Sequence, residues 1–332
     1  MTFRPPSFRA PVARRTVVLS FALAGLASFG CAASTPSATE TAPETATATP
    51  EAVATETTEA AAESGLTVDV FSASEAGLFV NSTLIMGENE AILVDAQYGR
   101  SDAEALVSWL QESGKTLTAI WITHAHPDHY FGTTVLKESF PDVPVYTSPE
   151  VAAKIAQLND MFVENVPKLV SPEEALTEPV VPTAYSEATL ELEGETIEIL
   201  SLDQGDTSMM TALYIPNSGT LVAGDLVYDQ VHIFMNENTT PELRQKWLTS
   251  LDTLAALNPT QIIPGHQSPD LEGGDGLTAI DFTRSYLEAF DAATALPTSE
   301  EAAKALVEAF PEAKLPFLAN MGVKAAYGEG GL

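Results

Sequence analysis

Short apolar runs alternate with amphipathic segments along residues 66–332, a pattern typical of strands and helices that follow one another. The apolar runs predict strands at Leu66–Phe71, Leu78–Met86, Glu90–Asp95, Leu117–Ile122, Val143–Thr147, Ala188–Leu192, Thr196–Leu202, Met210–Ile215, Thr220–Ala223 and Gln261–Ile263. Helical periodicity predicts helices at Asp102–Ser113, Thr133–Ser139, Pro149–Leu158, Pro241–Leu257, Ala279–Ala293 and Glu300–Ala309. Because strands and helices interleave, we expect one α/β sandwich rather than two domains.

Helix ends and loops depend on single residues. Ser101 is expected to cap the first helix, and Gly114 is expected to end it. Residues 160–185 contain prolines and no clear period, so we expect a loop or lid there. This segment and the 232–240 loop are expected to shape a pocket. The apolar side chains there belong either to that pocket or to the ordinary core, and they are Met161, Phe162, Phe234 and Met235.

Residues 1–33 have the pattern of an export signal. They carry four Arg and no acidic residue, and the apolar stretch Val17–Phe29 is too short to span a bilayer comfortably. Cys31 follows this stretch at a position that resembles a bacterial lipobox, although Phe29 stands where a small residue is usual. We therefore expect a periplasmic or cell-surface protein anchored by a lipid on Cys31. A free cysteine in a discarded signal is the alternative.

Residues 34–65 differ in composition from residues 66–332. Residues 34–65 are almost entirely Thr, Ala, Pro, Glu and Ser, which predicts a flexible linker. The whole chain has a formal charge of −31, and residues 66–332 retain −29 of it. Such an acidic surface repels phosphate backbones, so we expect no nucleic-acid partner. Cys31 is the only cysteine, so residues 66–332 contain no disulfide and no thiolate ligand.

The segment Thr123–His129 carries the clearest chemistry. It places His124, His126, Asp128 and His129 directly after a predicted buried strand. Imidazole and carboxylate are ligands of Zn²⁺ and related ions. Four such groups on one loop fit two metals better than one. Strand ends in layered α/β folds are also where sites are built.

Other strand ends carry residues of the same kind. Asp95, Asp225 and His266 each end an apolar run, and Asp206 lies in a short Gly-Asp-Thr turn. The chain has only five histidines, and four of them fall in this series. The fifth, His232, lies shortly after Asp225. We expect these strand ends to meet at a single site.

On these residues the chain resembles the metallo-β-lactamase-fold hydrolase superfamily, above all in the H-x-H-x-D-H series from His124 to His129. The resemblance covers most of residues 66–270 and implies a four-layer αβ/βα sandwich with two metals between its sheets. It implies that His124 and His126 bind a first metal and that Asp128, His129 and His266 bind a second.

The same resemblance implies that Asp225 bridges the two metals and that Asp95 orients the metal loop through hydrogen bonds. One position departs from the family, because Asp206 stands where a histidine usually completes the first metal site. Asp206 either binds through oxygen or only shapes the turn, in which case Asp203 or His232 could replace it. Zn²⁺ is the expected metal, and an oxygen ligand makes Fe or Mn²⁺ the alternatives.

The expected chemistry is hydrolysis by a metal-bridging hydroxide, since metals lower the pKa of bound water toward 7. Asp128 is expected to orient this nucleophile, and His232 is a candidate proton donor to the leaving group. For His232, a packed or surface histidine is the alternative. Tyr228 is either a substrate contact or a core residue.

The superfamily that the chain resembles acts on many substrates, so we use the charge of the chain to narrow the substrate class. The acidic surface and the lack of clustered Lys or Arg argue against nuclease activity and glutathione-thioester cleavage. The departure at Asp206 argues against a strong carbapenemase of the zinc type. We expect a small ester, lactone or amide as substrate. A metal-binding protein with reduced catalysis and a di-iron redox enzyme are the alternatives.

Overall fold

The computed structural model describes residues 65–271 and 277–329. The predicted signal with Cys31 and nearly all of the predicted linker lie outside these residues. Within the described part of the chain, no helix has the length and the apolar character needed to cross a membrane.

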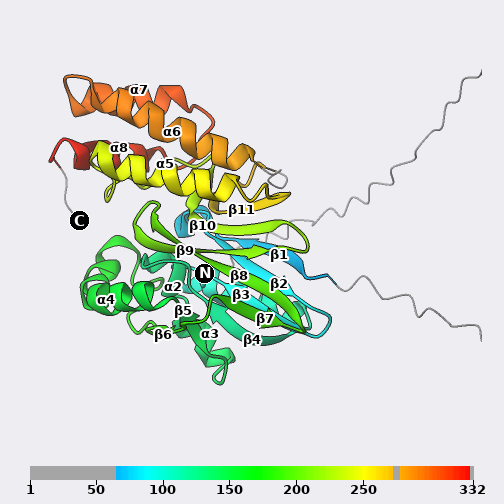
Figure 1. Cartoon of the computed structure of the whole chain (residues 1–332). Coiled ribbons are helices and arrows are strands. Elements are labelled where there is room, and N and C mark those ends of the chain that lie inside the picture. The colour runs from blue at the N-terminus through cyan, green and yellow to red at the C-terminus, as the bar shows by residue number, and fades with distance from the viewer. Residues whose placement is uncertain (1–64, 272–276, 330–332) are drawn as a thin grey trace, which may run out of the picture. The chain divides into compact units, whose positions relative to one another are not determined.

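Two sheets form the centre of the fold (Figure 1). The first has six strands in chain order: β1 (Thr67–Ser72), β2 (Asn81–Met86), β3 (Glu90–Val94), β4 (Thr116–Trp121), β5 (Val145–Thr147) and β6 (Thr183–Ala184). The second runs in the order β11 (Gln261–Gln267), β10 (Thr220–Asp229), β9 (Ser208–Ile215), β8 (Glu195–Gln204) and β7 (Thr189–Leu192). Strands β3 to β6 pair with one another in parallel, as do β10 and β11, and the remaining pairs are antiparallel.

Helices cover the outer face of each sheet. The first sheet packs against α1 (Arg100–Glu112), α3 (Thr133–Ser139) and α4 (Pro149–Leu169), and the second against α5 (Pro241–Ala255), α6 (Thr278–Thr294), α7 (Ser299–Ala309) and α8 (Pro316–Ala326). Two single turns complete the set, η1 (Glu75–Gly77) and α2 (Pro127–Tyr130). Figure 1 shows α5 to α8 above the sheets, α4 to their left and α3 at their lower edge. The predicted four-layer αβ/βα sandwich is confirmed.

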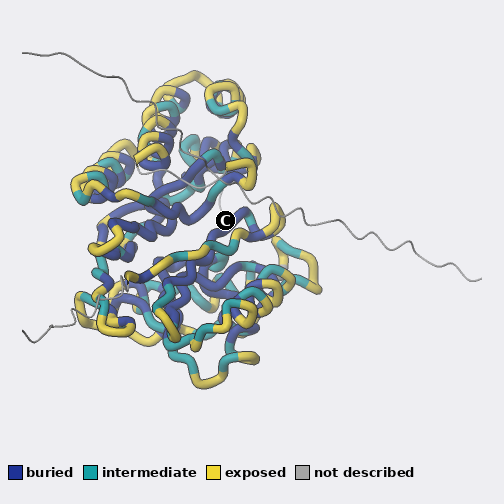
Figure 2. The backbone as a smooth tube through the Cα atoms, turned by 90° about the vertical axis from the view of Figure 1, so that its right-hand side faces the viewer, coloured by how far each residue is buried: buried dark blue, intermediate teal, exposed yellow. Residues whose placement is uncertain are grey.

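The two faces of each strand belong to different cores, as a period of two requires. In β2, Leu84 packs under the helices of the first sheet, whereas Ile85 packs between the sheets. In β10, Leu221 packs under α5 and α6, whereas Val222 faces the layer between the sheets. Figure 2 shows the buried backbone in dark blue through the sheets, with exposed segments in yellow on the outer helices. Both sheets are therefore covered on both faces, which keeps their strand ends rigid.

Several predicted boundaries were wrong. Ser101 is not the cap of α1, because Gly99 holds the N-cap position. Helix α4 does not end near Leu158 but continues to Leu169, since Val166 extends its buried face. Part of the expected 160–185 loop is therefore helical. The sequence reading also missed α8, although Pro316 occupies its first turn and its apolar residues recur at helical spacing.

Strand β10 is longer than predicted and carries Asp225 inside it rather than at its end. Gly224 has a φ of +52°, and the pairing of β10 with β11 shifts register on either side of it. A Cβ at Gly265 of β11 would overlap the Asp225 carboxylate. The two glycines thus allow the backbone to bend and the Asp225 side chain to enter the space between the sheet ends.

Candidate metal centre

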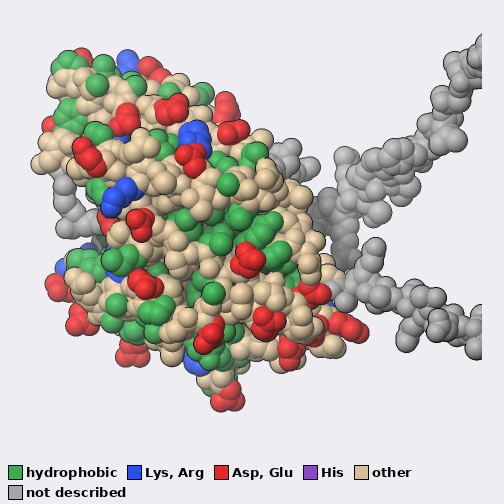
Figure 3. Space-filling view, viewed as in Figure 1, with side chains coloured by type: hydrophobic (Ala, Val, Ile, Leu, Met, Phe, Trp, Pro, Cys, Tyr) green, Lys and Arg blue, Asp and Glu red, His purple; other side chains and the backbone are tan. Residues whose placement is uncertain are grey.

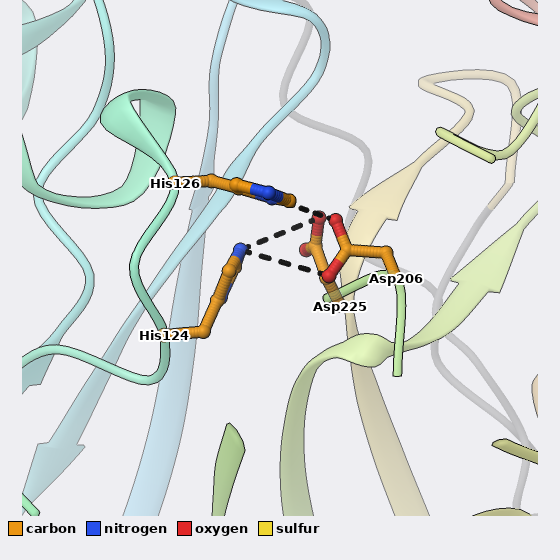
Figure 4. A group of neighbouring side chains, drawn as sticks. All are labelled: His124, His126, Asp206 and Asp225. Atoms are coloured by element: carbon orange, nitrogen blue, oxygen red, sulfur yellow. Dashed lines mark ion pairs between the residues drawn. The ribbon is translucent and has the colours of Figure 1, made fainter. Parts of the chain in front are cut away.

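Seven side chains from the predicted ligand set meet in two adjoining groups. Ligand-type atoms of His124, His126, Asp206 and Asp225 all lie within 4.8 Å of one another, and those of Asp128, His129 and His266 do the same. We call these the first and the second group. Figure 4 shows the first group, in which the histidines come from the loop after β4 and the aspartates approach from the opposite side.

Each histidine of the first group has one ring nitrogen held from outside. Thr123 Oγ1 donates to Asp95 Oδ2 at 2.8 Å, so it can accept from His124 Nδ1 at 2.9 Å. His126 reverses this arrangement, because its Nε2 donates to Glu237 Oε1 at 2.9 Å. The nitrogens that remain, His124 Nε2 and His126 Nδ1, face the group and are the atoms that could bind a metal. Such outer hydrogen bonds fix the tautomer and direction of metal-binding imidazoles.

The second group shows the same logic with different partners. His129 Nδ1 donates to Asp95 Oδ2 at 2.8 Å, and His266 Nδ1 donates to the Leu78 carbonyl at 2.7 Å. Their Nε2 atoms then face Asp128 Oδ2 at 3.7 and 3.4 Å. Asp95 therefore holds His129 directly and reaches His124 through Thr123, so one buried carboxylate orients both groups.

Asp225 lies between the groups. Its Oδ1 is 3.2 Å from His129 Nε2, and its Oδ2 is 3.0 Å from His266 Nε2 and 3.8 Å from His124 Nε2. Tyr228 donates a hydrogen bond to Asp225 Oδ2 at 2.6 Å, and its ring stacks on His266. Asp225 therefore contacts histidines of both groups.

Asp206 lies in the turn between β8 and β9 and is fully buried. Its Oδ2 is 2.8 Å from His126 Nδ1, and Asn238 holds its backbone carbonyl at 2.7 Å. Asp203 is exposed on β8 and belongs to neither group. The structure therefore brings Asp206, not Asp203, to the first group.

The pKa values reflect dense packing of opposite charges. Burial acts to lower the pKa of His266, but the Asp225 charge outweighs it and raises that pKa to about 10. Burial raises the pKa of Asp206 to about 7, even though His126 opposes the shift. Burial likewise lowers the pKa of His124 well below its usual value. Against the opposing effect of burial, Asp206 raises the pKa of His126 well above its usual value, and Asp225 does the same for His129. Buried carboxylates thus draw positive charge into both groups.

The donor set fits metal ions. His124 Nε2, His129 Nε2, Asp206 Oδ1 and Asp225 Oδ1 are buried, and no described residue gives them a hydrogen bond. Unpaired buried polar atoms cost about 1–3 kcal/mol each, so their gathering in this way calls for a partner. His124, Asp206 and Asp225 belong to the first group and His129 to the second, so a cation held by each group would satisfy them.

A cavity of about 340 Å³ opens onto both groups. Its polar end is formed by His126, Asp128, Asp206, Asp225 and His266. Of the four apolar residues whose place was left open, Met161, Phe162 and Phe234 line this cavity, whereas Met235 is buried in the core under the helices.

His232 is not brought to the centre. It is fully buried, its Nδ1 lies 3.1 Å from the Tyr286 hydroxyl, and it does not line the cavity. Burial lowers its pKa to about 4. Tyr228 does line the cavity, and its hydroxyl contacts Asp225 and Asp206.

Sequence reasoning missed Glu237 and Lys154. Glu237 accepts from His126 through one carboxylate oxygen and pairs with Lys154 Nζ at 3.2 Å through the other. Nothing in the polar segment around Glu237 distinguishes it. Lys154 gave a signal, because it lies three residues after Val151 on the buried face of α4.

Comparisons with known proteins agree with this geometry. The family model described as the metallo-beta-lactamase superfamily matches residues 76–266. A probable metallo-hydrolase from Streptococcus pyogenes serotype M6 is 30% identical over 80 residues, which cover 24% of this chain and 33% of that protein. A hydroxyacylglutathione hydrolase from Actinobacillus pleuropneumoniae serotype 5b is 37% identical over 68 residues, or 20% of this chain and 27% of that protein.

The chain thus spans a third or less of the length of these curated relatives. A solved metallo-beta-lactamase family protein from Thermus thermophilus aligns more fully. It is 26% identical with a TM-score of 0.56, and the alignment covers 80% of this chain and 94% of that one.

Proposed function

The chain belongs to the metallo-beta-lactamase superfamily of metal-dependent hydrolases, and from this premise we propose a dinuclear enzyme that cleaves small neutral esters, lactones or amides. The observation that carries the proposal is the convergence of two donor groups on Asp225, with unpaired buried atoms in each. Two divalent ions are proposed, one held by each group, with Zn²⁺ as the expected metal.

Some residues of the site would bind the metal ions, and others position the metal-binding side chains. His124, His126 and Asp206 would hold one ion, and Asp128, His129 and His266 the other, with Asp225 shared. Ions held there supply a water molecule of lowered pKa and a Lewis acid for a carbonyl oxygen. Asp95 and Glu237 keep the imidazoles in the required tautomer, so the site is organised before substrate arrives.

Hydrolysis joins a water oxygen to the carbonyl carbon, breaks the acyl bond to oxygen or nitrogen, and returns one proton to the leaving group. Asp128 lines the cavity and faces His129 and His266, from where its carboxylate can orient the attacking water. Burial raises the pKa of the Tyr228 hydroxyl well above its usual value, so Tyr228 stays a neutral donor. Its one proton is donated to Asp225 Oδ2, so Tyr228 orients this carboxylate, and the proton that reaches the leaving group comes from the attacking water. His232 does not line the cavity and is not the donor.

Charge supports a neutral substrate. Among the described residues that line the cavity there is no Lys or Arg, whereas Asp128, Asp206, Asp225 and Glu237 all line it. The relative from Actinobacillus pleuropneumoniae is named a hydroxyacylglutathione hydrolase. Glutathione thioesters carry carboxylates, and this cavity offers them no basic side chain. We propose that the chain does not share that substrate.

Location is proposed on the sequence alone. Residues 1–33 would direct export, and a lipid on Cys31 would tether the domain to a membrane surface through residues 34–65. Small substrates outside the cell membrane would reach the cavity without crossing it.

The test uses the full chain purified with Zn²⁺ and assayed on p-nitrophenyl acetate, γ-butyrolactone and a chromogenic cephalosporin. We expect hydrolysis of the ester or lactone, loss of activity on chelation, recovery with Zn²⁺, and no activity in His126→Ala. Asp142→Ala, an exposed acidic position outside the cavity, is the matched control and should retain activity. Metal binding without turnover would favour a binding protein. Activity that chelation leaves unchanged would overturn the proposal.

A further inference from the structure

The cavity has two chemically distinct ends. Beyond the metal centre, its walls come from the second half of α4 and from α8. These walls are apolar, and they include Phe162, Val166, Leu169, Phe317, Leu318 and Met321. Val166 and Leu318 are buried deep in them, whereas Leu169 is 65% exposed and Phe317 50% exposed at the rim. Large apolar side chains left in water beside a cavity mark a surface that binds an apolar group.

Much of this exposed apolar surface gathers at the same place. Met161, Leu169 and Phe317 are among the large hydrophobic side chains that the described chain exposes, and all three line this one cavity. Figure 3 shows hydrophobic side chains, in green, over the region of α4, with acidic side chains in red scattered around them. The apolar patch is therefore continuous with the catalytic end of the cavity.

Among the described residues on the α4 wall of the apolar end, the polar side chain is Asn165, whose amide already donates to the Met161 carbonyl and accepts from Lys168, so a charged group finds no cation there. Lys154 is the cation near the metal centre, and its Nζ is already bound to Glu237 and Ser208. A carboxylate or phosphate carried into the apolar end would lose its hydration without gaining a hydrogen bond, at a cost of several kcal/mol.

We propose that the substrate is a neutral ester or lactone with an unbranched apolar arm, and that α8 is the element that selects for this arm. This inference rests on the proposed hydrolase function. A cavity of about 340 Å³ lies near the lower end of the roughly 300–1,000 Å³ typical of small-molecule sites, so it suits a short or medium arm rather than a long lipid chain. Helix α8 lies beyond residues 76–266, so this wall is outside the matched family region.

The first experiment measures KM and kcat for the full Zn²⁺-loaded chain on p-nitrophenyl acetate, butanoate, hexanoate, octanoate and decanoate. Because each buried methylene contributes about 0.8 kcal/mol, we expect kcat/KM to rise up to about fourfold per methylene and to level off near octanoate. A parallel series of γ-alkyl lactones tells whether the arm belongs to the acyl side or the alcohol side. Equal kcat/KM for acetate and octanoate, with no rise in the lactone series, overturns the proposal.

A matched pair of esters tests the exclusion of charge. The mono-p-nitrophenyl ester of adipic acid has the same chain length as the hexanoate but ends in a carboxylate. We expect its kcat/KM to be at least about 100-fold lower, because a buried unpaired charge costs several kcal/mol. Similar values for the two esters would contradict the proposal.

Variants of α8 assign the selection to that helix. Phe317→Ser is expected to raise KM for the octanoate about tenfold and to leave acetate unchanged, because the rim contact is lost without touching the metal centre. Leu296→Ser, an exposed position that does not line the cavity, is the control. Met321→Lys should raise kcat/KM for the adipate ester. Unchanged octanoate KM in Phe317→Ser excludes α8 as the selecting element.

A binding measurement separates this inference from the hydrolase proposal. Titration calorimetry of the full chain with 1-octanol should show saturable binding that Phe317→Ser weakens and Leu296→Ser does not. If no ester of any length is cleaved but 1-octanol binds in this way, the hydrolase proposal fails and the apolar arm site stands. If esters are cleaved without regard to length and 1-octanol does not bind, the arm site fails alone.

Discussion

The two donor groups share Asp225 but are held in different ways. The second group has two imidazoles fixed by Asp95 and by a backbone carbonyl, both deep in the fold. In the first group, His124 is also anchored to Asp95 through Thr123, but His126 is held by Glu237, whose side chain lines the cavity. Each group includes an aspartate that belongs to it alone, Asp206 in the first and Asp128 in the second. The outer partner of His126 thus lies at the substrate space, so we expect the first group to bind metal more weakly and to be easier to change.

Removing the shared residue would erase the difference between the groups. Asp225→Ala should lower kcat/KM by at least about 1,000-fold, since it removes a ligand of both sites and several kcal/mol of transition-state stabilisation. Metal content should fall for both groups, as measured by elemental mass spectrometry alongside the ester assay. Asp142→Ala controls for the loss of one acidic side chain. Retention of two ions in Asp225→Ala would show that this carboxylate does not bridge.

Substitution of Asp206 should affect one group alone. Asp206→Ala should weaken metal binding at the first group by more than about 100-fold, because losing a ligand exceeds the 10–100-fold cost of losing an outer hydrogen bond. Asp206→His should instead shift preference toward Zn²⁺ over Mn²⁺, since imidazole is the softer donor. Metal titration of both variants checks this. If Asp206→Ala still binds two ions with parental affinity, Asp206 only shapes its turn.

The outer hydrogen bonds test the comparison more finely. Glu237→Gln should weaken the first site about tenfold, at the lower end of the outer-bond range, and leave the second unchanged. Gln retains the size of the side chain but lacks the charge that favours the His126 Nε2 proton. Asp95→Asn should affect both groups, because Asp95 reaches His129 directly and His124 through Thr123. Equal effects of Glu237→Gln on both sites would remove the distinction drawn between them.

His232 is a reference point outside both groups. Its folded pKa of about 4 lies below its usual 6.5, so its contribution to stability is complete above pH 6.5 and is lost as the pH falls from 6.5 through 4. That contribution amounts to at most about 3 kcal/mol. Urea unfolding from pH 7 to 4 should therefore show a shallower loss of stability in His232→Gln than in the parent chain. Parallel curves would place the acid sensitivity elsewhere.

The sequence predicted the donor set because most of its members follow or end an apolar run, although Asp225 lies inside β10 rather than at its end. Buried strands converge at one edge of a layered fold, so Asp95, the His124–His129 series and His266 had to meet. The superfamily resemblance supplied the pairing into two groups. His232 also lies shortly after Asp225 in the sequence, so it was a candidate for the same site. In the structure its side chain instead contacts Tyr286 of helix α6.

The features that the sequence did not reveal, Glu237 and the cavity wall on α8, depend on packing between distant segments. Glu237 reaches the site only because the turn that holds Asp206 and the face of α4 both contact it. Helix α8 gave local signals, but only its packing shows that Phe317 and Met321 face the cavity. Patterns along the chain identify elements and strand ends, whereas walls of a cavity are made by elements far apart in sequence.

Metal content of the purified full chain is the most direct measurement. Elemental mass spectrometry after equilibration with Zn²⁺ and removal of free metal should give about two ions per chain, and about one in Asp206→Ala. Two iron ions in chain purified without added metal would favour the redox alternative for an oxygen-containing site. One ion or fewer in the parent chain would contradict a dinuclear centre, and with it the proposal that both donor groups hold metal.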